Sequence, residues 1–190
     1  MEIVDIHSHV LPGVDDGAVS VDETIAMLRI AYDSGTRKIV ATPHMFLDLF
    51  HNNDFVQILD LFEQLKSDLE SCQESFPFLQ EMHIYSGAEN FASQEFLAAL
   101  EQGCVIQVNA DSIKGGSGSR ARKCSRSLLQ SGGVDVIASD GHRLRWRPPN
   151  LGGVLGRLEE EYTKDDIAGW LVENPGRILA NKRLVSAVAS

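Results

Sequence analysis

The chain has 190 residues, of which 43% are hydrophobic and 23% are charged, and this composition excludes a disordered protein. It predicts one globular domain over residues 1–190. The formal net charge of -10 argues against a nucleic-acid partner, because phosphate binding requires a basic surface. The three cysteines include no C-x-x-C pair, which predicts reduced thiols in a cytoplasmic protein. No apolar run is long enough to cross a bilayer, so we expect a protein that is not membrane-embedded.

The first predicted strand, residues 2–6, leads directly into His7 and His9. Alternate side chains of a strand point to opposite faces, so these two histidines lie on the same side and can share a metal ion. The turn that follows brings the carboxylates of Asp15 and Asp16 within reach of the same point. For an H-x-H motif taken alone, two surface histidines in a polar N-terminus remain the alternative.

The rest of the chain alternates short apolar runs with amphipathic ones. Further strands are predicted at residues 38–42, 82–86, 105–108 and 134–138, and helices at 20–35, 51–72, 93–102, 120–129, 150–162 and 165–179. This order of strand and helix predicts parallel strands covered by helices, an α/β fold.

Candidate metal ligands cluster at the ends of the predicted strands. The residues at or just past a carboxyl end are His7, His9, His44, Glu89, Asp140 and His142. Parallel β/α folds gather their functional sites at this end. Imidazole and carboxylate ligands together suit Zn, Mn or Fe, and such ions lower the pKa of water enough to supply hydroxide near neutral pH. His51 and His83 do not lie at strand ends, and we interpret them as loop and strand-surface residues.

Two other kinds of phosphate chemistry are excluded by spacing. A cysteine phosphatase loop requires arginine six residues after cysteine, and none of the three cysteines has one. The glycine-rich stretch 115–119 lacks the Gly-Lys-Ser/Thr sequence of a Walker loop. Any phosphatase activity is therefore expected to depend on metal.

Five motifs carry a resemblance to a known family: DIHSHVLPGVDDG at 5–17, ATPH at 41–44, YSGAE at 85–89, QVNA at 107–110 and SDGHR at 139–143. They resemble those of the bacterial metal-dependent tyrosine-protein phosphatases of the PHP (polymerase and histidinol phosphatase) superfamily, the CpsB/CapC/YwqE-like group. The similarity continues to residues 174–179. It implies a distorted (β/α)7 barrel and a role in capsule and exopolysaccharide synthesis.

The same resemblance implies a ligand set for two or three ions, Mn in the first place and Fe, Zn or Mg as alternatives. These ligands are His7, His9, Asp16, His44, Glu89, Asp140 and His142. Arg147, just before two prolines, matches the arginine that grips the phosphate. Asp140 and His142 are also candidates for assisting proton transfer, and the general acid stays unassigned.

One departure from the family pattern concerns the middle of the chain. Two β/α units that normally supply a bridging glutamate, a histidine ligand and an arginine are missing, since residues 98–103 lead straight to 104–107. The expected fold is therefore a distorted, shortened PHP-type (β/α) barrel that holds fewer ions. Its open wall predicts either a homo-oligomer across the gap or direct pairing of strand 82–86 with strand 105–108.

Three functions follow from this sequence. The first is a metal-dependent phosphomonoesterase that acts on the phosphotyrosine tail of a bacterial tyrosine autokinase. The second is a catalytically impaired remnant that binds metal or the kinase tail as an interaction module. The third is a hydrolase of small phosphate esters.

Overall fold

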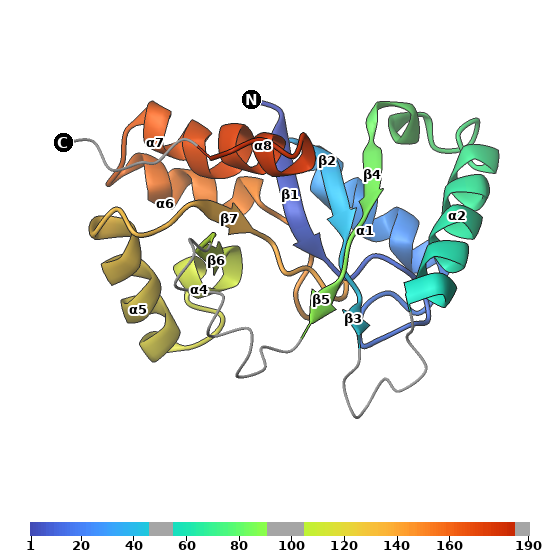
Figure 1. Ribbon diagram of the computed structural model, residues 1–190, viewed down its shortest axis with the longest axis horizontal. Helices are drawn as coiled ribbons and strands as arrows, with labels where there is room; N and C mark the ends of the chain where they lie inside the picture. The colour runs from blue at the N-terminus through green and yellow to red at the C-terminus, as the bar shows by residue number, and fades with distance from the viewer. Residues whose placement is uncertain (46–54, 91–104, 185–190) are drawn as a thin grey trace.

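Three parallel strands form the main sheet of the chain, for which the computed structural model describes residues 1–45, 55–90 and 105–184 (Figure 1). β1 (Ile3–Ser8), β2 (Thr36–Ala41) and β4 (His83–Ser86) lie in the order β1-β2-β4. Most of their Ile and Val side chains, which favour the pleated conformation, are buried. The α/β class with parallel strands that the sequence predicts is confirmed.

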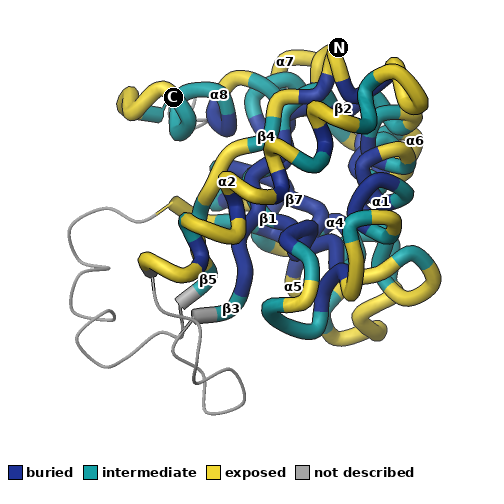
Figure 2. The backbone as a smooth tube through the Cα atoms, turned by 90° about the vertical axis from the view of Figure 1, so that its right-hand side faces the viewer, coloured by how far each residue is buried: buried dark blue, intermediate teal, exposed yellow. Residues whose placement is uncertain are grey.

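Two shorter pairs of parallel strands extend this sheet. β3 (His44–Met45) pairs with β5 (Glu89–Asn90), and β6 (Gln107–Asn109) pairs with β7 (Val136–Ala138). An isolated bridge between Ser8 and Gly141 joins the end of β1 to the segment that follows β7. Figure 2 shows the buried backbone of β1 and β7 at the centre of the molecule.

The strands therefore form an open arc in the order β4-β2-β1-β7-β6. Direct pairing of strand 82–86 with strand 105–108, the alternative to association across the gap, is wrong: among the described residues β4 pairs with β2, and β6 pairs with β7. The cause lies at the end of β1, where the backbone N–H of Asp140 donates to the carbonyl of His7 at 2.9 Å. This contact places β7 beside β1, and β6 then lies at the far end of the arc from β4.

Helices α1 (Val21–Asp33) and α2 (Phe55–Ser71), with the 3₁₀ turn η1 (Pro77–Glu81), cover the β1-β2-β4 side (Figure 1). α1 begins as predicted, because the Ser20 hydroxyl accepts a hydrogen bond from the N–H of Glu23 at 3.2 Å. The larger hydrophobic cluster lies here and includes Met27, Leu28, Ile39, Phe62 and Leu65.

A second set of helices packs around β6 and β7. It comprises α4 (Ala110–Lys114), α5 (Ser119–Gln130), η3 (Gly152–Val154), α6 (Leu155–Glu159), α7 (Lys164–Ala168), η4 (Gly169–Glu173) and α8 (Asn174–Leu179). The helix predicted at 165–179 is divided by the π-helical turn η4, which ends two residues before Pro175. Proline has no N–H for the helical ladder, so the hydrogen-bond pattern changes there. The buried Trp170 of this turn donates from Nε1 to the carbonyl of Val134 at 2.9 Å.

Some sequence predictions fall outside the described residues: the helix at 93–102, the start of the second helix at 51–54, His51 and Cys104. No described helix is both long and apolar enough to cross a membrane.

Candidate metal centre

The first histidine pair is held at the carboxyl end of β1. His9 is fully buried, and its Nδ1 donates to Oδ2 of Asp15 at 2.7 Å. Asp15 also accepts from the backbone N–H of His44 at 3.0 Å and of Gly17 at 2.8 Å. The hydrogen bond to Asp15 fixes the ring of His9 so that Nε2 faces the other candidate ligands.

The loop after His9 must pass close to the backbone of β1. A Cβ atom at Gly17 would collide with the carbonyl oxygen of His9, so only glycine fits without a shift. The N–H of Ala18 donates to the same oxygen at 3.0 Å. The loop is thereby closed back onto β1, and Asp16 reaches the histidines.

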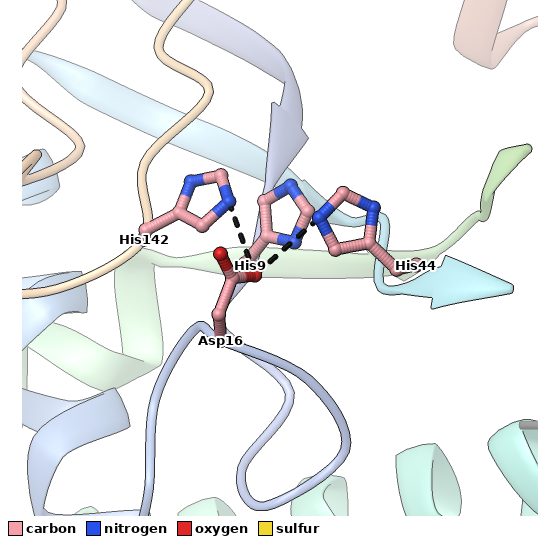
Figure 3. Close-up of side chains that lie close together, drawn as sticks. All are labelled: His9, Asp16, His44 and His142. Atoms are coloured by element: carbon pink, nitrogen blue, oxygen red, sulfur yellow. Dashed lines mark ion pairs between the residues drawn. The ribbon is translucent and has the colours of Figure 1, made fainter. Parts of the chain in front are cut away.

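Four side chains form the first group of candidate ligands (Figure 3): His9, Asp16, His44 and His142. Oδ1 of Asp16 lies 3.3 Å from Nε2 of His44 and 3.4 Å from Nε2 of His142. The rings of His9 and His142 stack with their centroids 3.7 Å apart. Figure 3 shows the Asp16 carboxylate pointing between the rings of His142 and His44, with a dashed line to each.

The second group comprises His7, His9 and Glu89. Oε2 of Glu89 lies 3.4 Å from Nε2 of His7, 3.3 Å from Nε2 of His9 and 3.0 Å from Nδ1 of His44. The short β3–β5 pairing sets this position, because His44 and Glu89 are direct partners in its register. Burial raises the pKa of Glu89, but hydrogen bonds from His7 and His9 outweigh it and hold the pKa well below its usual range.

Asp140 approaches both groups from the segment after β7. Its Oδ1 lies 3.5 Å from Nε2 of His7 and of His9 and 3.4 Å from Nδ1 of His142. Its backbone has a φ of 51°, a left-handed conformation that a non-glycine residue adopts at a cost. Its second oxygen, Oδ2, accepts hydrogen bonds from Asn109 at 2.6 Å and from Arg147.

The distances and the buried carboxylate oxygens both fit a metal centre. Donor atoms about 2.1 Å from a common ion are about 3.0–3.4 Å apart, which is close to the separations measured here. Oδ1 of Asp16 and Oε2 of Glu89 are buried, and imidazole nitrogens lie 3.0–3.4 Å from them. Buried carboxylate oxygens are costly unless paired, and a cation would satisfy them.

The model of the family described as "Capsular polysaccharide synthesis, CpsB/CapC" matches residues 3–103 and 98–180. The chain belongs to the CpsB/CapC family. The two matched segments overlap at residues 98–103.

Curated relatives in this CpsB/CapC family are similar over nearly all of the chain. The tyrosine-protein phosphatase CpsB of Streptococcus pneumoniae is 25% identical, covering 95% of this chain and 99% of the relative. YwqE of Bacillus subtilis, also a tyrosine-protein phosphatase, is 23% identical, covering 96% and 93%. Both alignments run over 241 positions, which exceeds the 190 residues of this chain.

A solved structure shares the fold. A chain from the crystal structures of YwqE from Bacillus subtilis and CpsB from Streptococcus pneumoniae, described as metal-dependent tyrosine phosphatases, superposes with a TM-score of 0.79. It is 21% identical, and the match covers 96% of each chain.

The structure of this chain brings together all seven residues that the resemblance implies as ligands, and it places Arg147 on Asp140. His83 is exposed on β4 and lies outside both ligand groups.

Sequence reasoning missed the residues that hold the ligands. The Gln107 amide is hydrogen-bonded to Nδ1 of His7 at 2.8 Å and to Oδ1 of Asn109 at 2.9 Å. Gln107 and Asn109 lie two positions apart on β6, so they face the same side and connect His7 with Asp140. The alternation of polar and apolar residues in Gln107–Asn109 is the sequence feature that could have indicated two polar side chains on one face of this strand.

Proposed function

We propose that this chain is a metal-dependent tyrosine-protein phosphatase that acts on the phosphotyrosine tail of a bacterial tyrosine autokinase in capsule and exopolysaccharide synthesis. The observation that carries this proposal is the convergence of four imidazoles and three carboxylates on one point at the carboxyl ends of parallel strands. The names of the family and of its curated relatives support the same activity. We place the protein in the cytoplasm, where such a tail would be accessible.

The ions are manganese in this proposal, with iron, zinc or magnesium as alternatives, because mixed imidazole and carboxylate ligands suit borderline and hard divalent cations. When bound, such an ion polarises a phosphoryl oxygen and lowers the pKa of a water molecule. His9, Asp16, His44 and His142 would hold one ion, and His7 with Glu89 and Asp140 a second one.

Arg147 is the proposed phosphate-binding residue. A guanidinium has five N–H groups, so the hydrogen bond to Asp140 leaves donors for the non-bridging oxygens of a phosphate. The same contact holds the arginine beside the ligand groups. We expect Arg147→Lys to preserve folding and to weaken substrate binding or turnover, because lysine cannot form the bidentate contact. Equal kinetics would remove Arg147 from the site.

We also infer that the barrel is shortened by an internal block of about two β/α units. The overlap of the two family matches at 98–103, the length of the alignments and the open arc from β4 to β6 support this inference. The chain would then lack the bridging glutamate, the histidine ligand and the arginine that these units supply in the family pattern, so we expect two ions at most.

The experiment that tests the proposal is metal analysis of the purified protein beside a p-nitrophenyl phosphate assay with and without added Mn²⁺. We expect bound metal and turnover that a chelator abolishes. In the His9→Ala variant, bound metal should fall at least about tenfold, the scale for a lost ligand interaction. Bound metal without turnover would contradict the phosphatase proposal and favour the binding remnant.

A further inference from the structure

The indole ring of Trp146 is exposed beside the candidate metal centre. Trp146 is 62% exposed. The only other tryptophan of the sequence, Trp170, is 3% exposed and belongs to the second hydrophobic cluster. An exposed tryptophan leaves one of the largest apolar side chains in contact with water. Packing of the described hydrophobic clusters does not explain this position, because Trp146 belongs to neither of them.

The backbone around Trp146 is fixed rather than free. The N–H of His142 donates to the carbonyl of Arg147 at 2.8 Å, and the N–H of Arg147 donates to the carbonyl of Arg143 at 3.1 Å. Nε of Arg143 donates in turn to the carbonyl of Asp16 at 3.2 Å. The turn that carries Trp146 is thus attached to two segments that supply candidate ligands.

The ring borders the site on two sides. It meets the ring of His142 edge-on, at a centroid distance of 5.4 Å and an interplanar angle of 70°. The guanidinium carbon of Arg147 lies 4.9 Å from the centroid of the Trp146 ring. The exposed ring of Trp146 therefore lies next to both the guanidinium of Arg147 and the imidazole of His142.

We propose that Trp146 is a specificity-determining residue that stacks on the aromatic ring of an aryl phosphate ester while its phosphate lies at the metal centre and Arg147. This inference rests on the proposed phosphatase function and deepens it. Aromatic rings attract each other at centroid separations of about 4.5–7 Å, the range that the Trp146 ring already shows with His142. Alkyl esters such as phosphoserine have no ring to offer, so Trp146 favours phosphotyrosine over phosphoserine.

Kinetics on two peptides of identical sequence, one with phosphotyrosine and one with phosphoserine, test the selectivity. We expect Trp146→Ala to lower kcat/KM for the phosphotyrosine peptide about three- to tenfold and to leave the phosphoserine peptide unchanged, and Trp146→Phe to restore most of the loss. Phe76→Ala is the matched control, because Phe76 is an exposed aromatic residue that lies against α1. A ratio between the two substrates that is the same in Trp146→Ala and wild type would overturn the inference.

Tryptophan fluorescence gives a second readout that needs no turnover. Because Trp170 is buried, we expect O-phosphotyrosine to change the emission of the Mn²⁺-loaded protein through Trp146 and O-phosphoserine to leave it unchanged. The response should disappear in Trp146→Phe. The same response to both amino acids, or none, would contradict the inference.

The two experiments together distinguish this inference from the proposed phosphatase function. A selective fluorescence response in a protein without turnover would overturn the proposed phosphatase function alone. Full activity with unchanged selectivity in Trp146→Ala would overturn this inference alone.

Discussion

At the scale of single residues, candidate histidine ligands are oriented by groups that bond to the ring nitrogen Nδ1. Asp15 holds Nδ1 of His9, the carbonyl of Asp140 accepts from Nδ1 of His142, and Gln107 is bonded to Nδ1 of His7. In each case the contact at Nδ1 directs Nε2 inward. Such outer contacts set the direction of a histidine ligand, and the oxygen acceptors at Nδ1 of His9 and His142 also set the tautomer.

Gln107 gives a sharp test of this arrangement. We expect Gln107→Met to lower Mn²⁺ affinity about tenfold or more, because methionine offers no strong partner to Nδ1 of His7. Gln107→Glu should lower the affinity as well, since a carboxylate has no N–H to donate to Nδ1 of His7 or to Oδ1 of Asn109. Isothermal titration with Mn²⁺ measures both, with Gln130→Met on the exposed end of α5 as the control for the same chemical change. Equal affinities in all four proteins would show that Gln107 does not position His7.

The charge of His9 makes a prediction about pH for the metal-free protein. Burial disfavours the imidazolium, but hydrogen bonds to Asp140, Asp15 and Glu89 outweigh it and raise the pKa of His9 from 6.5 to about 11. A raised pKa contributes stability that is complete below pH 6.5 and is lost as the pH rises through about 11. We therefore expect the His9 ring of the metal-free protein to stay protonated throughout the ordinary titration range of histidine, and NMR of the ring follows this directly. Asp15→Asn should lower that pKa, and a wild-type midpoint near 6.5 would contradict the prediction.

At the scale of elements, the sequence predicts the long strands and helices better than the short ones. β1, β2 and α1 follow from apolar runs and from the Ser20 cap. β3 and β5 have two residues each, and no periodicity can be read from two residues. Their pairing depends on tertiary contacts, yet it is what places His44 beside Glu89.

The candidate site shows the same division. The candidate ligands lie at strand ends that the sequence predicts. The roles of Gln107 and Asn109 depend on tertiary structure, because only the fold places them against His7 and Asp140. The left-handed backbone of Asp140 is also a product of the tertiary contacts around Gly141 rather than of local preference.

The loop that carries Asp16 allows a test at this scale. We expect Gly17→Ala to destabilise the protein by about 1–3 kcal/mol, because the added methyl group meets the carbonyl of His9 and moves the loop. Mn²⁺ affinity should fall with it, since Asp16 would no longer reach His44 and His142. Gly156→Ala is the matched control: no atom lies within 4 Å of its added Cβ, and alanine favours the helix by up to about 1 kcal/mol. Chemical denaturation compares the two, and equal stability would rule out the close approach at Gly17.

At the scale of the whole molecule, two hydrophobic clusters lie on either side of β1, and no described strand joins β4 to β6. Each of these outer strands has one strand neighbour among the described residues. Tyr85 next to one edge and Val105 and Ile106 next to the other are exposed. Open edges and exposed apolar side chains favour association.

We accordingly expect the chain to form a homo-oligomer at micromolar concentration. Light scattering should give at least twice the mass of one chain, and the double variant Tyr85→Lys, Ile106→Lys should give the monomer, because charges on strand edges block edge-to-edge pairing. Glu159→Lys, at an exposed position of helix α6, serves as the charge control. A monomeric wild-type protein with a cooperative melt would contradict association across the gap.

The central claim is that the seven clustered ligands hold the ions on which phosphotyrosine hydrolysis depends. The most direct measurement is a titration of metal-stripped protein with Mn²⁺ while phosphate release from a phosphotyrosine peptide is followed. Metal-dependent catalysis predicts no release without metal, a rise that saturates as Mn²⁺ binds, and no rise in His9→Ala. Phosphate release by the stripped protein, or full Mn²⁺ binding without any release, would contradict it.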